Sequence, residues 1–434
     1  MTTITMPTDS SLDRWRFRFF TIWATQAVSQ IGSSVVQFAL IWWITKTVGS
    51  ATALATASLM GLLPFVVLGP FAGALVDRWN RKRVMVIADT ITMLCVMVLA
   101  YLFWTERVQV WHAYALMFIR SCCGAFQNNA MQASTSLLVP QTQLSRVAGL
   151  NQMLQGGNSI LAPIIAALLL VWLPLQGMLM IDVITALPAI AALMIFIIPQ
   201  PLRKPNNQQP ITNNLLQDMR EGLTFVLRWR GLLYVTLMSL VINFLLTPTG
   251  ALTPLLVMRH FGGQAADLAK LESAFGIFVI IGGLTLSAWG GFKHPRQGHI
   301  ITTLVGLVGL GAGVLLIGFA PGNALWMAIA GMALLGFMQV LCNGPMMSIF
   351  QAKVPNHMQG RVMSLIGSSS MLMSPISLAV SGPLSDLIGI RVWYVVGGIA
   401  CILMAALAAL SPSVMRIEEY VHSPAEMQQQ GEVL

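Results

Sequence analysis

Two ionisable side chains, Asp182 and Arg120, lie inside otherwise uncharged apolar stretches that are long enough to cross a membrane. Asp182 stands about seven residues from the nearer end of its stretch, which is roughly 10 Å along a helix rising 1.5 Å per residue. An arginine at the centre of a spanning helix costs about 2.5–3.5 kcal/mol, so Arg120 should face a watery cavity or a partner. A carboxylate at such a depth can bind and release a proton, so we predict that Asp182 and Arg120 serve proton coupling. The alternatives are an aspartate that fixes helix packing and an arginine that acts as a strut. Asp89 lies closer to the charged end of its stretch and is a weaker candidate.

Amide side chains recur at helical spacing within several of these stretches. Gln26, Gln30, Ser33 and Gln37 follow one another at intervals of four, three and four residues, which places them on one helix face. Amides are poor lipid-facing residues, so we expect such faces to line a central cavity. The alternative is hydrogen bonding between helices without any contact to a cargo. With apolar neighbours that could accept a variable ligand, the predicted cargo-binding residues are Gln26, Gln30, Gln37, Phe38, Phe126, Asn128, Met131, Asn158, Asn243, Gln339 and Asn343.

A charged motif joins the second and third apolar stretches and contains Gly73, Asp77, Arg78 and Arg81. A carboxylate at Asp77 can meet the positive N-terminal end of a neighbouring helix, and the arginines can bridge carboxylates. We therefore predict that these four residues form a conformational latch. The alternative is a solvated charge cluster that only orients the chain in the membrane.

This motif is similar to a loop signature of the major facilitator superfamily, Gly-x-x-x-Asp-Arg-x-Gly-Arg-Lys-Arg. Asn80 replaces its second glycine and tolerates the left-handed backbone expected there. The residues from Arg120 to Gly124 are similar to a second signature of that family, Arg-x-x-Gln-Gly, with Cys123 in place of the glutamine.

Further segments, among them residues 22–29, 57–64 and 118–121, resemble bacterial macrolide efflux proteins. The resemblance implies proton-coupled export, by alternating access, of bulky amphipathic and often cationic drugs such as macrolides. Exporters of this kind also carry siderophores and other metabolites, so a dedicated metabolite or siderophore exporter is the alternative. Arg120 is the one cation deep inside a stretch, which favours neutral or cationic cargo over anionic cargo.

The composition indicates an all-α integral membrane protein. The chain has 434 residues, of which 56% are hydrophobic and 9% charged, whereas soluble domains have about 25% charged residues. Twelve apolar stretches predict spanning helices, because each has at least the roughly 20 residues that a crossing needs. They lie near residues 18–45, 52–76, 84–104, 109–138, 147–172, 175–199, 232–258, 268–291, 299–320, 323–352, 361–388 and 391–411.

The second six stretches repeat the first six at a constant offset. Val139, Pro140 and Arg146 recur as Val354, Pro355 and Arg361, and Asn128 recurs as Asn343. Two related six-helix bundles are typical of a secondary transporter whose cargo path runs between them. We therefore predict a tail over residues 1–16, a bundle over 17–199, a linker with an amphipathic helix over 200–231, a second bundle over 232–411, and a tail over 412–434.

The basic residues orient the chain. Most of the 24 Lys and Arg residues fall in the tails, the central linker and every second loop. This distribution predicts a protein of the bacterial inner membrane with both termini in the cytoplasm. The net charge of +9 is thus a topological signal, and we expect no nucleic-acid partner.

Patterns typical of enzymes do not occur in the sequence. It contains no Walker-type phosphate loop, no zinc-binding His/Glu pattern and no serine elbow, and its six histidines are scattered. A membrane-embedded enzyme is therefore the weaker alternative. We expect no cofactor or metal, a proton gradient as the energy source, a small amphipathic molecule and the lipid bilayer as partners, and a monomer.

Overall fold

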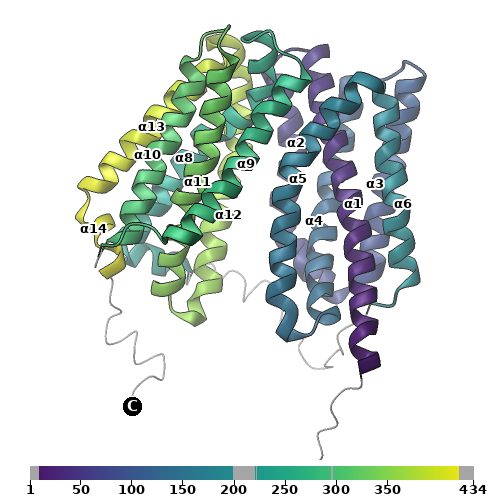
Figure 1. Ribbon diagram of the computed structural model, residues 1–434, viewed down its shortest axis with the longest axis horizontal. Helices are drawn as coiled ribbons and strands as arrows, with labels where there is room; N and C mark the ends of the chain where they lie inside the picture. Colours follow the sequence, from purple (N-terminus) through teal and green to yellow (C-terminus); the bar gives the residue numbers. More distant parts are fainter. Residues whose placement is uncertain (1–8, 199–219, 221, 295–296, 420–434) are drawn as a thin grey trace, which may run out of the picture. The chain divides into compact units, whose positions relative to one another are not determined.

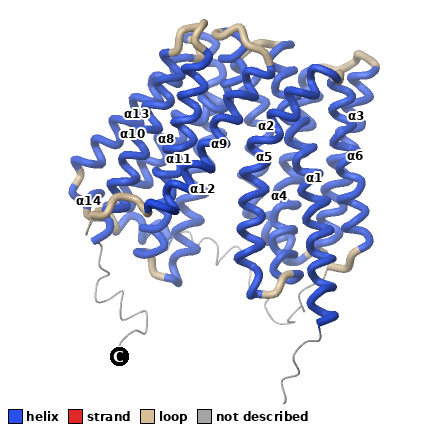
Figure 2. The backbone as a smooth tube through the Cα atoms, in the orientation of Figure 1, coloured by secondary structure: helices blue, strands red, loops and turns tan. Residues whose placement is uncertain are grey.

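The computed structural model describes residues 9–198, 220, 222–294 and 297–419. The described part is helical, with short connections and no strand (Figure 1, Figure 2). Twelve helices in it have 20 or more residues, as the twelve apolar stretches predicted. Residues 1–8 and 420–434 of the predicted tails and most of the predicted linker lie outside the described residues. Residues 9–16 of the first predicted tail belong to a long helix, residues 412–419 of the second include two short helical turns, and residues 222–228 of the linker are helical.

Six long helices come from the first half of the chain. They are α1 (Asp9–Thr47), α2 (Ala51–Arg78), α3 (Arg81–Trp104), α4 (Val110–Leu138), α5 (Leu144–Trp172) and α6 (Leu175–Ile195). The second half supplies α8 (Arg230–Arg259), α9 (Ala265–Trp289), α10 (Gly298–Phe319), α11 (Leu325–Lys353), α12 (Asn356–Ile388) and α13 (Arg391–Leu410). Short helical turns are η1 (Gln141–Gln143), α14 (Pro412–Met415) and η2 (Ile417–Glu419).

Eleven of these helices are long and apolar enough to cross a membrane. The remaining long helix, α4, is long enough but too polar to meet this criterion. It carries Arg120 together with Gln127, Asn128, Asn129 and Gln132. A helix with so many polar side chains is tolerated at membrane depth when it faces a watery cavity or other helices. The composition of α4 therefore already indicates where a polar site should be sought.

The connection between α2 and α3 differs from the expectation at one residue. Asn80 does not adopt the left-handed backbone expected from the signature's glycine, since its φ is −73° and its ψ is 109°. Its side chain instead accepts a hydrogen bond from the Arg83 N–H at 3.1 Å and caps α3. Asparagine is among the preferred capping residues, which explains the substitution.

The described residues form two compact units, one of which contains residues 9–198, 251–273 and 378–387. In this first unit α1 packs against α5 and α6, α3 packs against α4 and α6, and α2 packs against α4. A cluster of buried apolar side chains that includes Phe19, Ile22, Met85 and Leu193 joins α1, α3 and α6. The packing of α1, α3 and α4 places their polar faces around one space.

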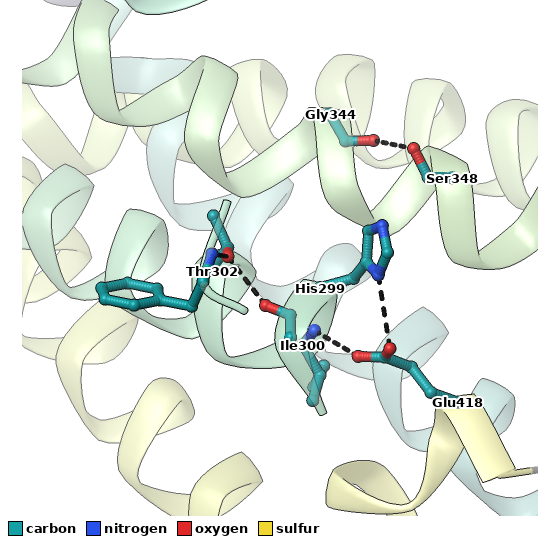
Figure 3. Close-up of polar contacts among 8 residues, drawn as sticks. His299, Ile300, Thr302, Gly344, Ser348 and Glu418 are labelled. Atoms are coloured by element: carbon teal, nitrogen blue, oxygen red, sulfur yellow. Dashed lines mark hydrogen bonds and ion pairs between the residues drawn. The ribbon is translucent and has the colours of Figure 1, made fainter. Parts of the chain in front are cut away.

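The second unit contains the remaining described residues. There α10 packs against α11 and α13. Gly313 of α10 and Gly331 of α11 allow the close approach, because a Cβ added to either would lie within 2.8 Å of the other's carbonyl oxygen. Glu418 closes the start of α10 by accepting hydrogen bonds from the Ile300 N–H at 2.8 Å and from His299 at 3.3 Å (Figure 3).

Candidate functional site

A polar cavity of about 780 Å³ lies within the first unit. Its walls come from α1, α3, α4 and α5, with Phe65 added from α2. Amides dominate the polar lining, and ligand sites of small molecules commonly have volumes of roughly 300–1,000 Å³. The amide and charged lining side chains are Gln26, Gln30, Asp89, Arg120, Gln127, Asn128, Gln132, Asn151, Gln152 and Gln155, and the hydroxyl side chains are Ser29, Ser33, Thr92, Thr135 and Ser136.

Four of the predicted cargo-binding residues lie at this cavity, namely Gln26, Gln30, Asn128 and Met131. They come from two helices, α1 and α4, which the structure brings to the same space. The helical spacing of the amides therefore indicated part of the lining of this cavity, and their contact with a cargo stays a prediction. The lining also includes Asn151 and Gln155 of α5, whose amides follow a helical interval of four residues.

Four other predicted residues of the first unit do not line the cavity. Phe38 is buried in α1, with 6% of its surface exposed, and Phe126 stacks on Trp79 at a centroid distance of 6.1 Å. Asn158 donates to the Ser34 hydroxyl at 2.8 Å, which is the helix-to-helix role left open by the sequence. Gln37 is half-buried further along α1.

The remaining three predicted residues belong to the second unit. Asn243 of α8 donates from its amide to the Ser239 carbonyl at 2.8 Å. Gln339 and Asn343 lie one turn apart on α11, the first half-buried and the second exposed. Their contribution to cargo binding stays a prediction.

Asp182 and Arg120, which the sequence singled out separately, lie next to each other in the structure. The Arg120 Nη1 atom lies 3.6 Å from Asp182 Oδ2, and Arg120 Nη2 donates to the Ser33 carbonyl at 3.1 Å. The Ser33 hydroxyl donates to Asp182 Oδ1 at 2.7 Å. Asp182 is 4% exposed, whereas Arg120 reaches the cavity wall. A proton that arrived at Asp182 would remove one charge of this buried pair and change how firmly Arg120 is held.

Asp89 of α3 has quite different surroundings. Its Oδ2 atom accepts hydrogen bonds from Gln26 Nε2 at 2.9 Å and from Gln127 Nε2 at 3.2 Å. Gln127 also donates to Gln26 Oε1 at 3.2 Å, so the two amides form a linked pair around one carboxylate oxygen. The described residues supply no cation within ion-pair distance of this carboxylate. The sequence indicated that Asp89 was the weaker candidate, because its depth in the membrane could be judged only from its position along its own helix. Its hydrogen-bond partners, which come from α1 and α4, are not visible in that position.

The predicted latch residues lie where α2 ends. Arg81 is buried and donates from Nη1 to the Ala133 carbonyl of α4 at 2.9 Å. A Cβ added to Gly73 would lie 3.4 Å from Asn129 Oδ1, so the glycine lets α2 approach α4. Arg78 is the last residue of α2. The side chain of Asp77 lies outside the described part, and the latch stays a prediction.

A carboxylate at a helix N-terminus, the contact predicted for Asp77, does occur at Asp386. Asp386 of α12 accepts hydrogen bonds from the Ser50 hydroxyl and the Ala51 N–H, both at 2.8 Å, and from Thr52 in the first turn of α2. A signal for it was present in the sequence. Gly382, Asp386 and Gly389 repeat the spacing of Gly73, Asp77 and Asn80.

Long apolar helices around an amide-lined cavity with few charges define a multi-pass membrane protein that handles a small molecule. The pattern of the Major Facilitator Superfamily matches residues 22–378, and the chain belongs to this family of transporters. It is 33% identical to macrolide efflux protein A of Streptococcus pyogenes over 406 residues, covering 94% of this chain and 98% of that protein.

Two further comparisons extend the picture. The multidrug efflux pump Tap of Mycolicibacterium fortuitum is 24% identical over 402 residues, covering 89% of this chain and 94% of that protein. The fold matches the crystal structure of a D-xylose–proton symporter with a TM-score of 0.68 at 13% identity, over 94% of this chain and all of that chain. The chain is thus a transporter with homology to macrolide and multidrug efflux pumps.

Proposed function

We propose that this protein exports bulky amphipathic drugs, macrolides among them, from the cytoplasm in exchange for protons, by alternating access. The observation that carries the proposal is the buried Asp182–Arg120 pair at the wall of an amide-lined cavity. Homology to macrolide efflux protein A over nearly the whole chain supports the same cargo class.

The pair offers a simple route from proton binding to a change at the cavity. Ionised Asp182 holds Arg120 by charge, and Arg120 also reaches the Ser33 carbonyl on α1. Protonation of Asp182 removes that attraction, so Arg120 gains freedom to turn toward the cavity or its contents. The Ser33 hydroxyl can stay hydrogen-bonded to the neutral carboxyl group. Helices α1, α4 and α6 would therefore respond together to one proton.

The orientation follows from the basic residues. The excess of Lys and Arg in the tails, the linker and alternate loops supports an orientation with both termini in the cytoplasm. With this orientation the proton gradient of a bacterial inner membrane favours proton entry, which is the direction that drives cargo outward.

The experiment is accumulation of radiolabelled erythromycin in an efflux-deficient bacterial host that expresses the chain. We expect lower accumulation than in cells with an empty vector, and restoration of accumulation when a protonophore is added. Unchanged accumulation would exclude macrolide export and favour the metabolite or siderophore alternative. Export that persists with the protonophore, while cellular ATP is held constant, would exclude proton coupling.

A further inference from the structure

Asp89 gives the cavity wall an excess of negative charge. Asp89 and Arg120 are the charged side chains that line the cavity in the described part of the chain. The charge of Arg120 is balanced by Asp182, from which it lies 3.6 Å. Asp89 has amide partners alone, and amides orient a carboxylate without neutralising it. A cavity with this balance attracts a cation.

The hydrogen bonds around Asp89 also leave acceptors available. Both amide donors go to Oδ2, whereas Oδ1 accepts no hydrogen bond from any described residue. The neighbouring Gln127 Oε1 is a buried acceptor that likewise has no hydrogen-bond partner among the described residues. Buried polar atoms are nearly always paired. The unpaired Gln127 Oε1 atom beside the available Oδ1 atom of Asp89 is therefore suited to a ligand that donates hydrogen bonds and carries positive charge.

We infer that Asp89, held by Gln26 and Gln127, is a specificity site that binds a protonated amine of the cargo. The inference rests on the proposed export function and assigns cargo selection to a residue apart from the Asp182–Arg120 pair. The N–H of an ammonium donates to Asp89 Oδ1, and the adjacent carbon atoms of the cargo contact apolar lining residues such as Trp23 and Met131.

The surroundings of Asp182 and Asp89 explain why the cargo amine binds at Asp89 and not at Asp182. Asp182 is 4% exposed and is already engaged by Ser33 and Arg120, so a bulky ammonium cannot reach it without breaking the pair. Asp89 faces the cavity and has no cation to displace. The other ionisable groups that act on Asp89 are Asp182 from α6 and Cys123 from α4, neither of which is a cation. Among the described residues that line the cavity, the one cation is therefore Arg120, which is already paired with Asp182, and Asp89 is left to a positive ligand.

The test is equilibrium binding to the full-length protein, purified in lipid nanodiscs, with two probes of nearly the same shape. Erythromycin carries a tertiary amine that is protonated at neutral pH, and its N-oxide carries no net charge. We expect Asp89→Asn to weaken erythromycin binding about 10- to 100-fold, the range for a hydrogen bond to a charged group. Binding of the N-oxide should change less than about two-fold, because it makes no such bond.

Two further variants separate the inference from loss of fold. Asp89→Glu keeps the charge and should retain the preference for erythromycin over its N-oxide. Asp267→Asn removes a carboxylate that pairs with Lys270 at 2.8 Å on α9, away from the cavity lining, and should bind both probes as wild type does. An Asp89→Asn protein that loses both probes equally, or neither, would overturn the inference while leaving drug export in place. If wild type binds neither probe, the proposed function fails and the inference fails with it.

Discussion

The carboxylate of Asp386, near the end of α12, accepts hydrogen bonds from both the hydroxyl and the backbone N–H of Thr52 in the first turn of α2, at 2.6 and 3.0 Å. Negative charge is favourable at this end of a helix, because its first N–H groups have no partner within the helix. Gly382, one turn earlier, permits the contact, since a Cβ there would lie 2.9 Å from that of Ala55. The hydrogen bonds of Asp386 and the close approach at Gly382 together hold α12 against α2.

Removing the carboxylate should loosen this contact. Ala55 is 2% exposed beneath it, so Ala55→Cys in a background without the native cysteines should react slowly with a membrane-impermeant maleimide. We expect Asp386→Ala to raise the labelling rate several-fold. Asp267→Ala, which removes a carboxylate from α9 instead, should leave the rate unchanged. Equal rates with and without Asp386 would mean that the carboxylate does not hold the two helices together.

Close packing of α10 on α11 depends on two glycines. Gly331→Ala places a Cβ 2.7 Å from the Gly313 carbonyl oxygen, and such overpacking typically destabilises a protein by about 1–3 kcal/mol. We expect a lower thermal midpoint of the purified protein, followed by fluorescence-detected size exclusion. Gly283→Ala on α9 is the matched control, because a Cβ there meets no atom within 4 Å. A midpoint for Gly331→Ala at or above that of the control would contradict this account of the packing.

The sequence was a good guide to the helices and to part of the cavity lining. The twelve apolar stretches and the spacing of Gln26 and Gln30 depend on local periodicity, which a single chain displays directly. The pairing of Asp182 with Arg120 was not predicted, although both residues were singled out as ionisable groups inside apolar helices.

The sequence was a poor guide wherever a side chain's surroundings come from other helices. Asp89 looked peripheral along α3, yet its partners Gln26 and Gln127 belong to α1 and α4. Phe38 and Asn158 have the right residue types for a cavity but turn toward helix contacts instead. Periodicity selects a helix face, and it does not say which neighbour that face will meet.

Asp182→Asn should separate proton coupling from folding. The amide has nearly the shape of the carboxyl group, and its oxygen can still accept from the Ser33 hydroxyl. We expect erythromycin efflux driven by an imposed pH gradient in proteoliposomes to fall at least about ten-fold, while the amount of folded protein stays the same. Asp386→Asn, a carboxylate outside the cavity lining, should keep gradient-driven efflux above that of Asp182→Asn. Wild-type efflux by Asp182→Asn would remove Asp182 from the coupling mechanism.

Arg120→Leu should be more harmful alone than together with Asp182→Asn. Loss of the guanidinium leaves the buried carboxylate of Asp182 without its cation, and breaking a buried ion pair from one side typically costs about 3–5 kcal/mol. In the double variant no unpaired charge remains, so part of that stability should return. The thermal midpoints of wild type, both single variants and the double variant form a double-mutant cycle that measures the coupling. Additive losses would show that Arg120 is held by the Ser33 carbonyl rather than by Asp182, and the proton switch based on this pair would then lose its physical basis.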